Sequence, residues 1–476
     1  MSGISLGRVT VLLLLARAMT YVLGVANSVV LARTLGVDQL GVYAYAVGLA
    51  GLFALLPNMG IGTIVTRAVA RDPAAAAALV PTALRAQGLL AVGVLIGAPA
   101  LAAALPGHPA PWYHVALAAA QLAIGTLSWP YLAVLGGHAR YDRLAVAELL
   151  AGGVGTATLV AAATLHGGVG QFLSAQVAAA VVAVLVARRV AAPFIPRRDG
   201  DALALGTLLR RGAPLGATAA LQGVYTRLDV LLLGQLASTV ALGLYNVAYK
   251  PVNLAVYFGA AIAGTLLPLM AQSRGPTPPV AFDRALRGLA AAGPALALIL
   301  TGLGGALLRT LYGPEFEAAA PVLGVLAWSA VANWLYAPLG VALQARGAER
   351  AWLACMAAGL LVNAAGNWWA IPRWGALGAA SATLASEVVL FGLGLGLTRW
   401  RLQLRVSTRP VLAALGATAV GGAVLWLGMP IEVASATVAA LAVYGSLLLL
   451  FRAVTVRDLK LVAGWVRQAA VGASGA

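Results

Sequence analysis

The sequence predicts an all-α polytopic membrane protein with about fourteen transmembrane helices, and three observations support this class. Hydrophobic residues make up 61% of the 476 positions and charged residues only 9%, against about 25% charged residues in soluble domains. The mean hydropathy is +0.92. Apolar segments of roughly 20 residues, the length that crosses a bilayer core, recur along the whole chain. Such a composition cannot cover a water-facing surface.

The spans follow one another with short connections and leave no room for a soluble domain. Arg17 interrupts the first apolar segment, and many spans follow it, so we interpret this segment as a retained helix rather than a signal peptide. The predicted spans are 10–32, 40–64, 82–105, 112–136, 144–165, 168–188, 212–236, 240–270, 285–309, 317–344, 351–371, 375–398, 410–429 and 432–452.

The basic residues predict the orientation. Most of the 31 lysines and arginines fall in one set of alternate loops, whereas Arg33, Arg309 and Arg373 fall in the opposite set. Cytoplasmic loops are rich in lysine and arginine, so we expect both termini in the cytoplasm. The net charge of +17 then reflects orientation, and a nucleic-acid partner is not expected.

The two halves of the chain resemble each other, which predicts a parallel repeat. LARTLGVDQLGVYAYAVGLA aligns with LLGQLASTVALGLYNVAYKP and pairs Gly41 with Gly243 and Tyr43 with Tyr245. A later alignment pairs Gly170 with Gly378. We therefore expect two pseudo-symmetric six-helix lobes plus two C-terminal helices. The expected boundaries are 1–190 for the N-terminal lobe, 191–211 for a cytoplasmic linker, 212–400 for the C-terminal lobe, and 401–476 for two additional helices and a cytoplasmic tail.

The segment YTRLDVLLLGQL places Arg227 and Asp229 inside an apolar span. Residues two apart point about 200° apart on a helix, so these two side chains cannot pair with each other. If the spans 212–236 and 240–270 form a hairpin, Asp229 and Lys250 lie at similar depth, roughly 15 Å from the turn. The spacing therefore predicts an ion pair between Asp229 and Lys250.

Further polar residues share faces with these charges and complete a predicted substrate site. Tyr21 lies on the same stripe as Arg17, Asn253 follows Lys250 on the same helix face, and Asn333 belongs to a polar stripe of the tenth span. Intramembrane arginines usually face water or an anionic ligand, and a guanidinium suits a pyrophosphate through bidentate hydrogen bonds. The predicted substrate-binding residues are Arg17, Tyr21, Arg227, Lys250, Asn253 and Asn333.

Several blocks of the chain resemble the bacterial polysaccharide flippases, members of the multidrug/oligosaccharidyl-lipid/polysaccharide exporter superfamily. They include VVLARTLGVDQLGVYAYAVGLAGLF, YTRLDVLLLGQLASTVALGLYNVAYKPVNL and IPRWGALGAASATLASEVV. The resemblance implies two helical bundles around a central cavity. It also implies that an undecaprenyl-pyrophosphate-linked oligosaccharide, a cell-surface polysaccharide precursor, crosses the bacterial cytoplasmic membrane by alternating access. In the related lipid II flippases, cavity arginines lie on the first, second and eighth helices; here Arg17 and Lys250 match two of these, and Arg67 lies at the end of the second span.

The motifs indicate a transporter rather than an enzyme. No GxxxxGK[ST] phosphate loop is present, so we expect no intrinsic ATPase. The single cysteine and the four histidines form no ligand cluster, so we expect no metal centre, and we expect no cofactor. Asp229 is the candidate for coupling to Na+ or H+, whereas Glu148 and Glu387 are more simply interpreted as structural. A cation-coupled multidrug exporter and a lipid II flippase are the alternatives within the superfamily. A membrane glycosyltransferase would need larger outer loops. We expect a monomer.

Overall fold

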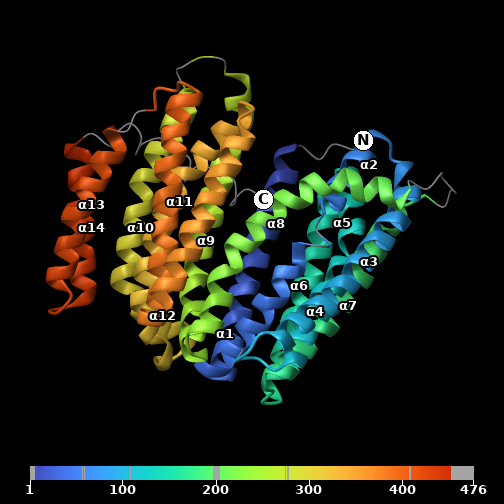
Figure 1. The fold of residues 1–476 in the computed structure, drawn as a ribbon. Coiled ribbons are helices and arrows are strands. Elements are labelled where there is room, and N and C mark those ends of the chain that lie inside the picture. Colours follow the sequence, from blue (N-terminus) through green and yellow to red (C-terminus); the bar gives the residue numbers. More distant parts are fainter. Residues whose placement is uncertain are drawn as a thin grey trace. The chain divides into compact units, whose positions relative to one another are not determined.

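The computed structural model is helical over the part of the chain that it describes (Figure 1). The described residues are 6–55, 57, 59–107, 109–196, 204–273, 275, 278–406 and 409–451. Among them no β-strand occurs, and eleven helices are long and apolar enough to cross a membrane. The predicted class, an all-α polytopic membrane protein, is confirmed.

The chain divides into two compact units, Met1–Asn246 and Val247–Ala476. The two six-helix lobes were predicted from the internal sequence repeat, whereas these units are defined by contacts within the structure. The lobes therefore stay a prediction. The helices of the first unit are α1 (Leu6–Leu52), α2 (Ile61–Arg71), α3 (Ala75–Ala104), α4 (Trp112–Thr126), α5 (Trp129–Gly137), α6 (Tyr141–Thr164), α7 (Val169–Ala191) and α8 (Leu205–Leu236). Helix α9 (Thr239–Gln272) begins in the first unit and continues into the second.

The second unit contains the remaining helices of the described chain. They are α10 (Val280–Tyr312), α11 (Ala320–Ala345), α12 (Glu349–Arg401), α13 (Arg409–Gly428) and α14 (Val433–Leu450). A short 3-10 helix, Pro314–Ala319, joins α10 to α11. Tyr444 of α14 donates a hydrogen bond of 2.8 Å to the carbonyl oxygen of Ala291 in α10, which fixes the C-terminal helix pair on this unit.

Two long helices are each divided by one glycine. Gly36 in α1 has φ 71° and ψ 175°, and Gly375 in α12 has φ 52° and ψ −127°. Side chains with a Cβ rarely adopt such angles, so glycine allows the chain to turn there. These breaks separate the predicted spans 10–32 and 40–64 in α1, and 351–371 and 375–398 in α12. Two of the eleven membrane-crossing helices therefore account for four predicted spans. Helix α8, which is not among the eleven, matches the predicted span 212–236.

The predicted span 40–64 is wrong in its second half. The helix ends at Leu52, a 3-10 turn covers Phe53–Leu55, and a separate helix, α2, begins at Ile61. Pro57 cannot donate a backbone hydrogen bond, and Gly60 adopts a left-handed conformation (φ 66°), so the chain cannot continue as one helix. The predicted span 112–136 is likewise interrupted, because α4 ends at Thr126 and Pro130 lies in the first turn of α5.

One cluster of buried apolar residues holds several helices together at one end of the first unit. Ile61, Val65 and Val69 follow one face of α2 at a spacing of four and are almost fully buried. They pack with residues of α3, α5 and the start of α8. Because Arg67 and Arg71 lie on α2 and Arg210 lies at the start of α8, connections rich in arginine meet at this end.

Candidate functional site

The predicted site residues fall in both units, and each group is described within its own unit. Arg17, Tyr21, Arg227 and Asp229 belong to the first unit; Lys250, Asn253 and Asn333 belong to the second. The side chain of Arg17 lies outside the described part of the chain, although its backbone is helical. Tyr21, Lys250 and Asn253 are partly buried. The predicted Asp229–Lys250 ion pair would join the two units, and it stays a prediction.

Asp229 is buried in the first unit, with 6% of its surface exposed. The hydroxyl of Tyr245 in α9 donates a hydrogen bond of 2.7 Å to its Oδ2 atom. Asp229 and Tyr245 are close because α8 and α9 form a helical hairpin with its turn at residues 237–238. A hydrogen bond to a charged group typically contributes about 1.5–3 kcal/mol, so Tyr245 offsets part of the cost of burying this carboxylate.

Arg227 packs between α8 and α1. A Cβ placed on Gly51 of α1 would collide with the Arg227 guanidinium, so the guanidinium lies directly against the glycine backbone. Gly48, one turn earlier on α1, faces Val230 in the same way. Glycines on α1 thus make room for the α8 side chains. Arg227 therefore packs on α1, and because its side chain is only partly buried, its role in substrate binding stays a prediction.

The two repeated segments contact each other at the opposite end of the first unit from the arginine-rich connections. Gly41 lies against the carbonyl oxygen of Thr239, and Gly243 lies against the carbonyl oxygen of Val37. The repeat alignment pairs Gly41 with Gly243 and, at the same offset, Val37 with Thr239. The contact is therefore reciprocal, as in a two-fold interface. A hydrogen bond from Thr239 to the Asp38 carboxylate joins the same two segments.

Tyrosine hydroxyls make further polar contacts between helices near the Thr239–Asp38 hydrogen bond. The Gln235 amide donates a hydrogen bond of 2.5 Å to the Tyr45 hydroxyl, and the Gln176 amide donates one to Tyr43. Tyr45 is completely buried and its ring lies against Gly234. Together with Asp229 and Tyr245, these pairs form a row of polar contacts between α1, α7, α8 and α9.

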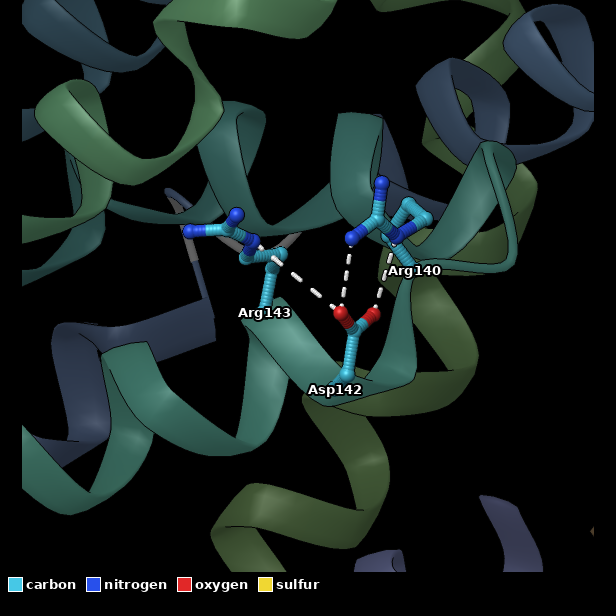
Figure 2. A network of polar contacts seen from close by, with 3 residues as sticks. All are labelled: Arg140, Asp142 and Arg143. Carbon is cyan, nitrogen blue, oxygen red and sulfur yellow. Dashed lines mark hydrogen bonds and ion pairs between the residues drawn. The ribbon is translucent and has the colours of Figure 1, made fainter. Parts of the chain in front are cut away.

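The arginine-rich end of the first unit carries a small ionic network (Figure 2). Arg140 donates two hydrogen bonds, of 2.9 and 2.7 Å, to the Asp142 carboxylate, and Arg143 lies 4.0 Å from the same group. The hydrogen bonds with Asp142 raise the pKa of the Arg140 guanidinium above its ordinary value. The Arg140 guanidinium also stacks on Phe194, 5.0 Å from the ring centroid, and His138 bonds to the Phe194 carbonyl oxygen at 3.2 Å. These contacts tie the α5–α6 connection to the segment after α7.

In the second unit, Asn333 is held by its own helix. Its Nδ2 atom donates a hydrogen bond of 2.8 Å to the hydroxyl of Tyr336. Tyr336 is buried, and its ring packs at a tilt against Trp352, with centroids 5.8 Å apart. The neighbouring Trp334 donates a hydrogen bond of 2.7 Å to the Ala255 carbonyl oxygen and fills the space beside Gly259. Helices α9 and α11 are thus locked together next to Asn333.

The structure brings together a polar cluster that the sequence interpretation largely missed, which we call the α12 cluster. Gly366 packs against Ala382 and Gly359 against Leu390, so the two halves of α12 approach closely. Polar side chains from both halves are buried between these contacts: Asn363, Asn367, Thr383, Ser386 and Glu387. Asn367 donates a hydrogen bond of 3.0 Å to Asn363. The missed signal was two asparagines four residues apart in an apolar segment.

Comparisons with known proteins agree with this architecture. A family model described as "Polysaccharide biosynthesis protein" matches residues 6–274, and a model described as "MatE" matches residues 214–369. A curated protein of Haloferax volcanii, named probable flippase AglR, is 26% identical over 457 residues, covering 90% of this chain and 92% of that protein.

Two solved structures share the fold. The lipid II flippase MurJ, in an inward closed conformation, has a TM-score of 0.71 at 11% identity and covers 94% of this chain and 99% of that chain. An inward-facing multidrug resistance MATE family transporter has a TM-score of 0.62 at 13% identity, covering 81% and 94%.

Proposed function

Because the chain belongs to the polysaccharide biosynthesis protein family, we propose that it moves an undecaprenyl-pyrophosphate-linked oligosaccharide across a bacterial cytoplasmic membrane by alternating access. The chain is a multi-pass membrane protein of the flippase superfamily. The lipid-linked oligosaccharide and the bacterial source are the parts that we propose. Similarity to a probable flippase along nearly the whole chain supports this assignment.

The observation that carries the proposal is the set of basic side chains within apolar helices. A charged residue at the centre of a membrane helix costs about 2.5–3.5 kcal/mol on insertion scales, so such residues usually serve transport. Arg17 on α1, Arg227 on α8 and Lys250 on α9 are of this kind. Guanidinium and ammonium groups match the charge of a pyrophosphate, and guanidinium also matches its bidentate hydrogen-bond geometry. Tyr21, Asn253 and Asn333 are proposed to bind the sugar or the headgroup.

The proposed orientation places the arginine-rich connections, and both termini, in the cytoplasm. The clustering of α2, α5 and the start of α8 at one end of the first unit supports it. An anionic headgroup that moves outward is then favoured by an inside-negative potential, by about 2.3 kcal/mol per charge per 100 mV.

Coupling to Na+ or H+ is a further part of the proposal. Asp229 is the carboxylate predicted for this role, and the α12 cluster offers Glu387 with amide and hydroxyl oxygens, which are ligands that hard cations favour. Transport by Asp229→Asn and Glu387→Gln would be compared with wild type under a Na+ gradient, a pH gradient or no gradient. Equal wild-type rates in all three conditions would rule coupling out.

Translocation of a lipid-linked oligosaccharide into reconstituted vesicles tests the proposal. Arg17→Ala and Lys250→Ala should each slow it by roughly 10- to 100-fold, the loss of one or two charge-assisted hydrogen bonds. Arg309→Ala is the matched control, because Arg309 is 64% exposed and lies 3.5 Å from Glu317. Undiminished translocation by both variants, with normal insertion, would defeat the proposed site.

A cation-coupled multidrug exporter is the second candidate, and the match of residues 214–369 to the "MatE" model favours it. Such exporters carry organic cations, for which the basic set Arg17, Arg227 and Lys250 is unsuited. Lipid II is the third candidate. Vesicles that take up lipid II, or that expel an organic cation, in preference to lipid-linked oligosaccharide would replace the proposed substrate.

A further inference from the structure

Helix α12 turns at Gly375, and three tryptophans project from this turn. Trp368, Trp369 and Trp374 are 67%, 53% and 52% exposed. The rings of Trp369 and Trp374 meet edge to face, with centroids 5.2 Å apart. Gly378 lies against the Ala370 carbonyl oxygen, which keeps the two arms of the turn close and the indoles on its outside.

Arg373 lies among these indoles and is also exposed. Its guanidinium stacks over Trp369, 4.6 Å from the ring centroid, and donates a hydrogen bond to the Trp369 carbonyl oxygen. In the described part of the chain, no carboxylate lies within ion-pair distance of it. The positive charge is therefore held in place by an aromatic ring and a backbone dipole, neither of which neutralises it.

The same helix shows which environment surrounds the turn. Leu361, Leu377 and Val388 of α12 are 71%, 37% and 52% exposed. Exposed leucine and valine on a membrane-spanning helix face lipid chains. Tryptophans at the end of such a face lie at the level of the lipid headgroups, where indoles are enriched.

We propose that Arg373, with Trp368, Trp369 and Trp374, forms a binding site for the phosphate headgroup of an anionic phospholipid at the membrane surface where α12 turns. The indoles hold the turn at the headgroup level, and the guanidinium presents paired N–H donors to the phosphate oxygens. Charge complementarity selects an anionic lipid, because a zwitterionic headgroup already carries its own cation. This inference is independent of the transported substrate.

Arg309 provides an internal comparison. It lies in the last turn of α10 and, like Arg373, belongs to the few arginines that the sequence assigns to the arginine-poor side of the membrane. Its charge is balanced by Glu317 at 3.5 Å. Arg309 therefore should not select anionic lipid, and Arg309→Gln serves as the matched control for Arg373→Gln.

The test uses the full-length protein in detergent and measures the change in unfolding temperature on adding lipid. Phosphatidylglycerol should raise the unfolding temperature of wild type and Arg309→Gln, and Arg373→Gln should lose most of this rise. Phosphatidylcholine and inorganic phosphate at the same concentration should give much smaller rises. Arg373→Lys, which keeps the charge but loses the planar donors, should retain an intermediate rise.

Each variant is compared with and without lipid, so a changed baseline stability does not affect the result. An unchanged phosphatidylglycerol response in Arg373→Gln would overturn the proposal. Inorganic phosphate that reproduces the full rise would also overturn it, because the site would then bind a free anion rather than a lipid.

Discussion

At the scale of single residues, Asp229 shows how α8 and α9 hold a carboxylate inside an apolar segment. The sequence predicted that this acid needs a partner from the next span. In the first unit the Tyr245 hydroxyl is such a partner, 2.7 Å from Oδ2. The predicted pairing with Lys250 compared depth alone and did not consider Tyr245, a neutral donor closer to the turn. The ion pair with Lys250 stays a prediction.

Removing that hydroxyl tests the role of the contact. Tyr245→Phe should lower the free energy of unfolding by about 1.5–3 kcal/mol, because a buried carboxylate loses a hydrogen bond. Tyr257→Phe, at a position 67% exposed, should have little effect. Chemical denaturation of the detergent-solubilised protein measures both variants. Equal stabilities would show that Tyr245 contributes nothing to holding Asp229.

Arg227 makes a contact that the sequence did not predict. The guanidinium lies on Gly51 of α1, a residue 176 positions earlier in the chain. Such a long-range contact has no local sequence signal, and only the fold reveals it.

At the scale of elements, the repeat predicted from sequence has a physical counterpart. Gly41 and Gly243 each lie against a carbonyl oxygen of the other segment, and the contacted residues are themselves paired by the alignment. Close backbone approach of this kind requires the absence of a Cβ at both positions. The two repeated segments are therefore held together by a reciprocal contact.

Leucine substitutions test this reciprocity. Gly41→Leu and Gly243→Leu should each destabilise the protein by about 1–3 kcal/mol, because the side chain would overlap backbone atoms that cannot move aside cheaply. Gly88→Leu is the control, since nothing lies within 4 Å of a Cβ there. Thermal unfolding measures all three. Unequal effects at Gly41 and Gly243, with one of them neutral, would contradict a symmetric contact.

The membrane spans could be predicted because the length of an apolar segment determines them. The helix breaks inside those spans could not be predicted in this way. Apolar length located α6, α7 and α10 to within several residues. It failed over residues 53–64, where Pro57 and Gly60 end one helix and start another while the composition stays apolar. It also overlooked most of the α12 cluster, because asparagine, serine and threonine scattered through an apolar helix resemble isolated polar residues until the two halves of α12 are packed together.

At the scale of the whole molecule, orientation follows from charge. The arginine-rich connections should face the cytoplasm, and the turn at Ser238 should face outward. With Cys355 replaced by alanine, Ser238→Cys should react with a membrane-impermeant thiol reagent in intact cells, and Arg143→Cys should not. Ser238 and Arg143 are both exposed in the structure, so a difference in labelling would reflect the side of the membrane rather than burial in the protein. The reverse labelling pattern would invert the topology.

The proposed transport depends on intramembrane cations that bind phosphate, and a binding measurement addresses that most directly. The full-length protein would be titrated with a polyprenyl-pyrophosphate-linked oligosaccharide and with the same oligosaccharide on a polyprenol without phosphate. The pyrophosphate form should bind roughly 100-fold more tightly, and Lys250→Ala and Arg227→Gln should each reduce this preference. Equal affinity for the two forms would contradict it.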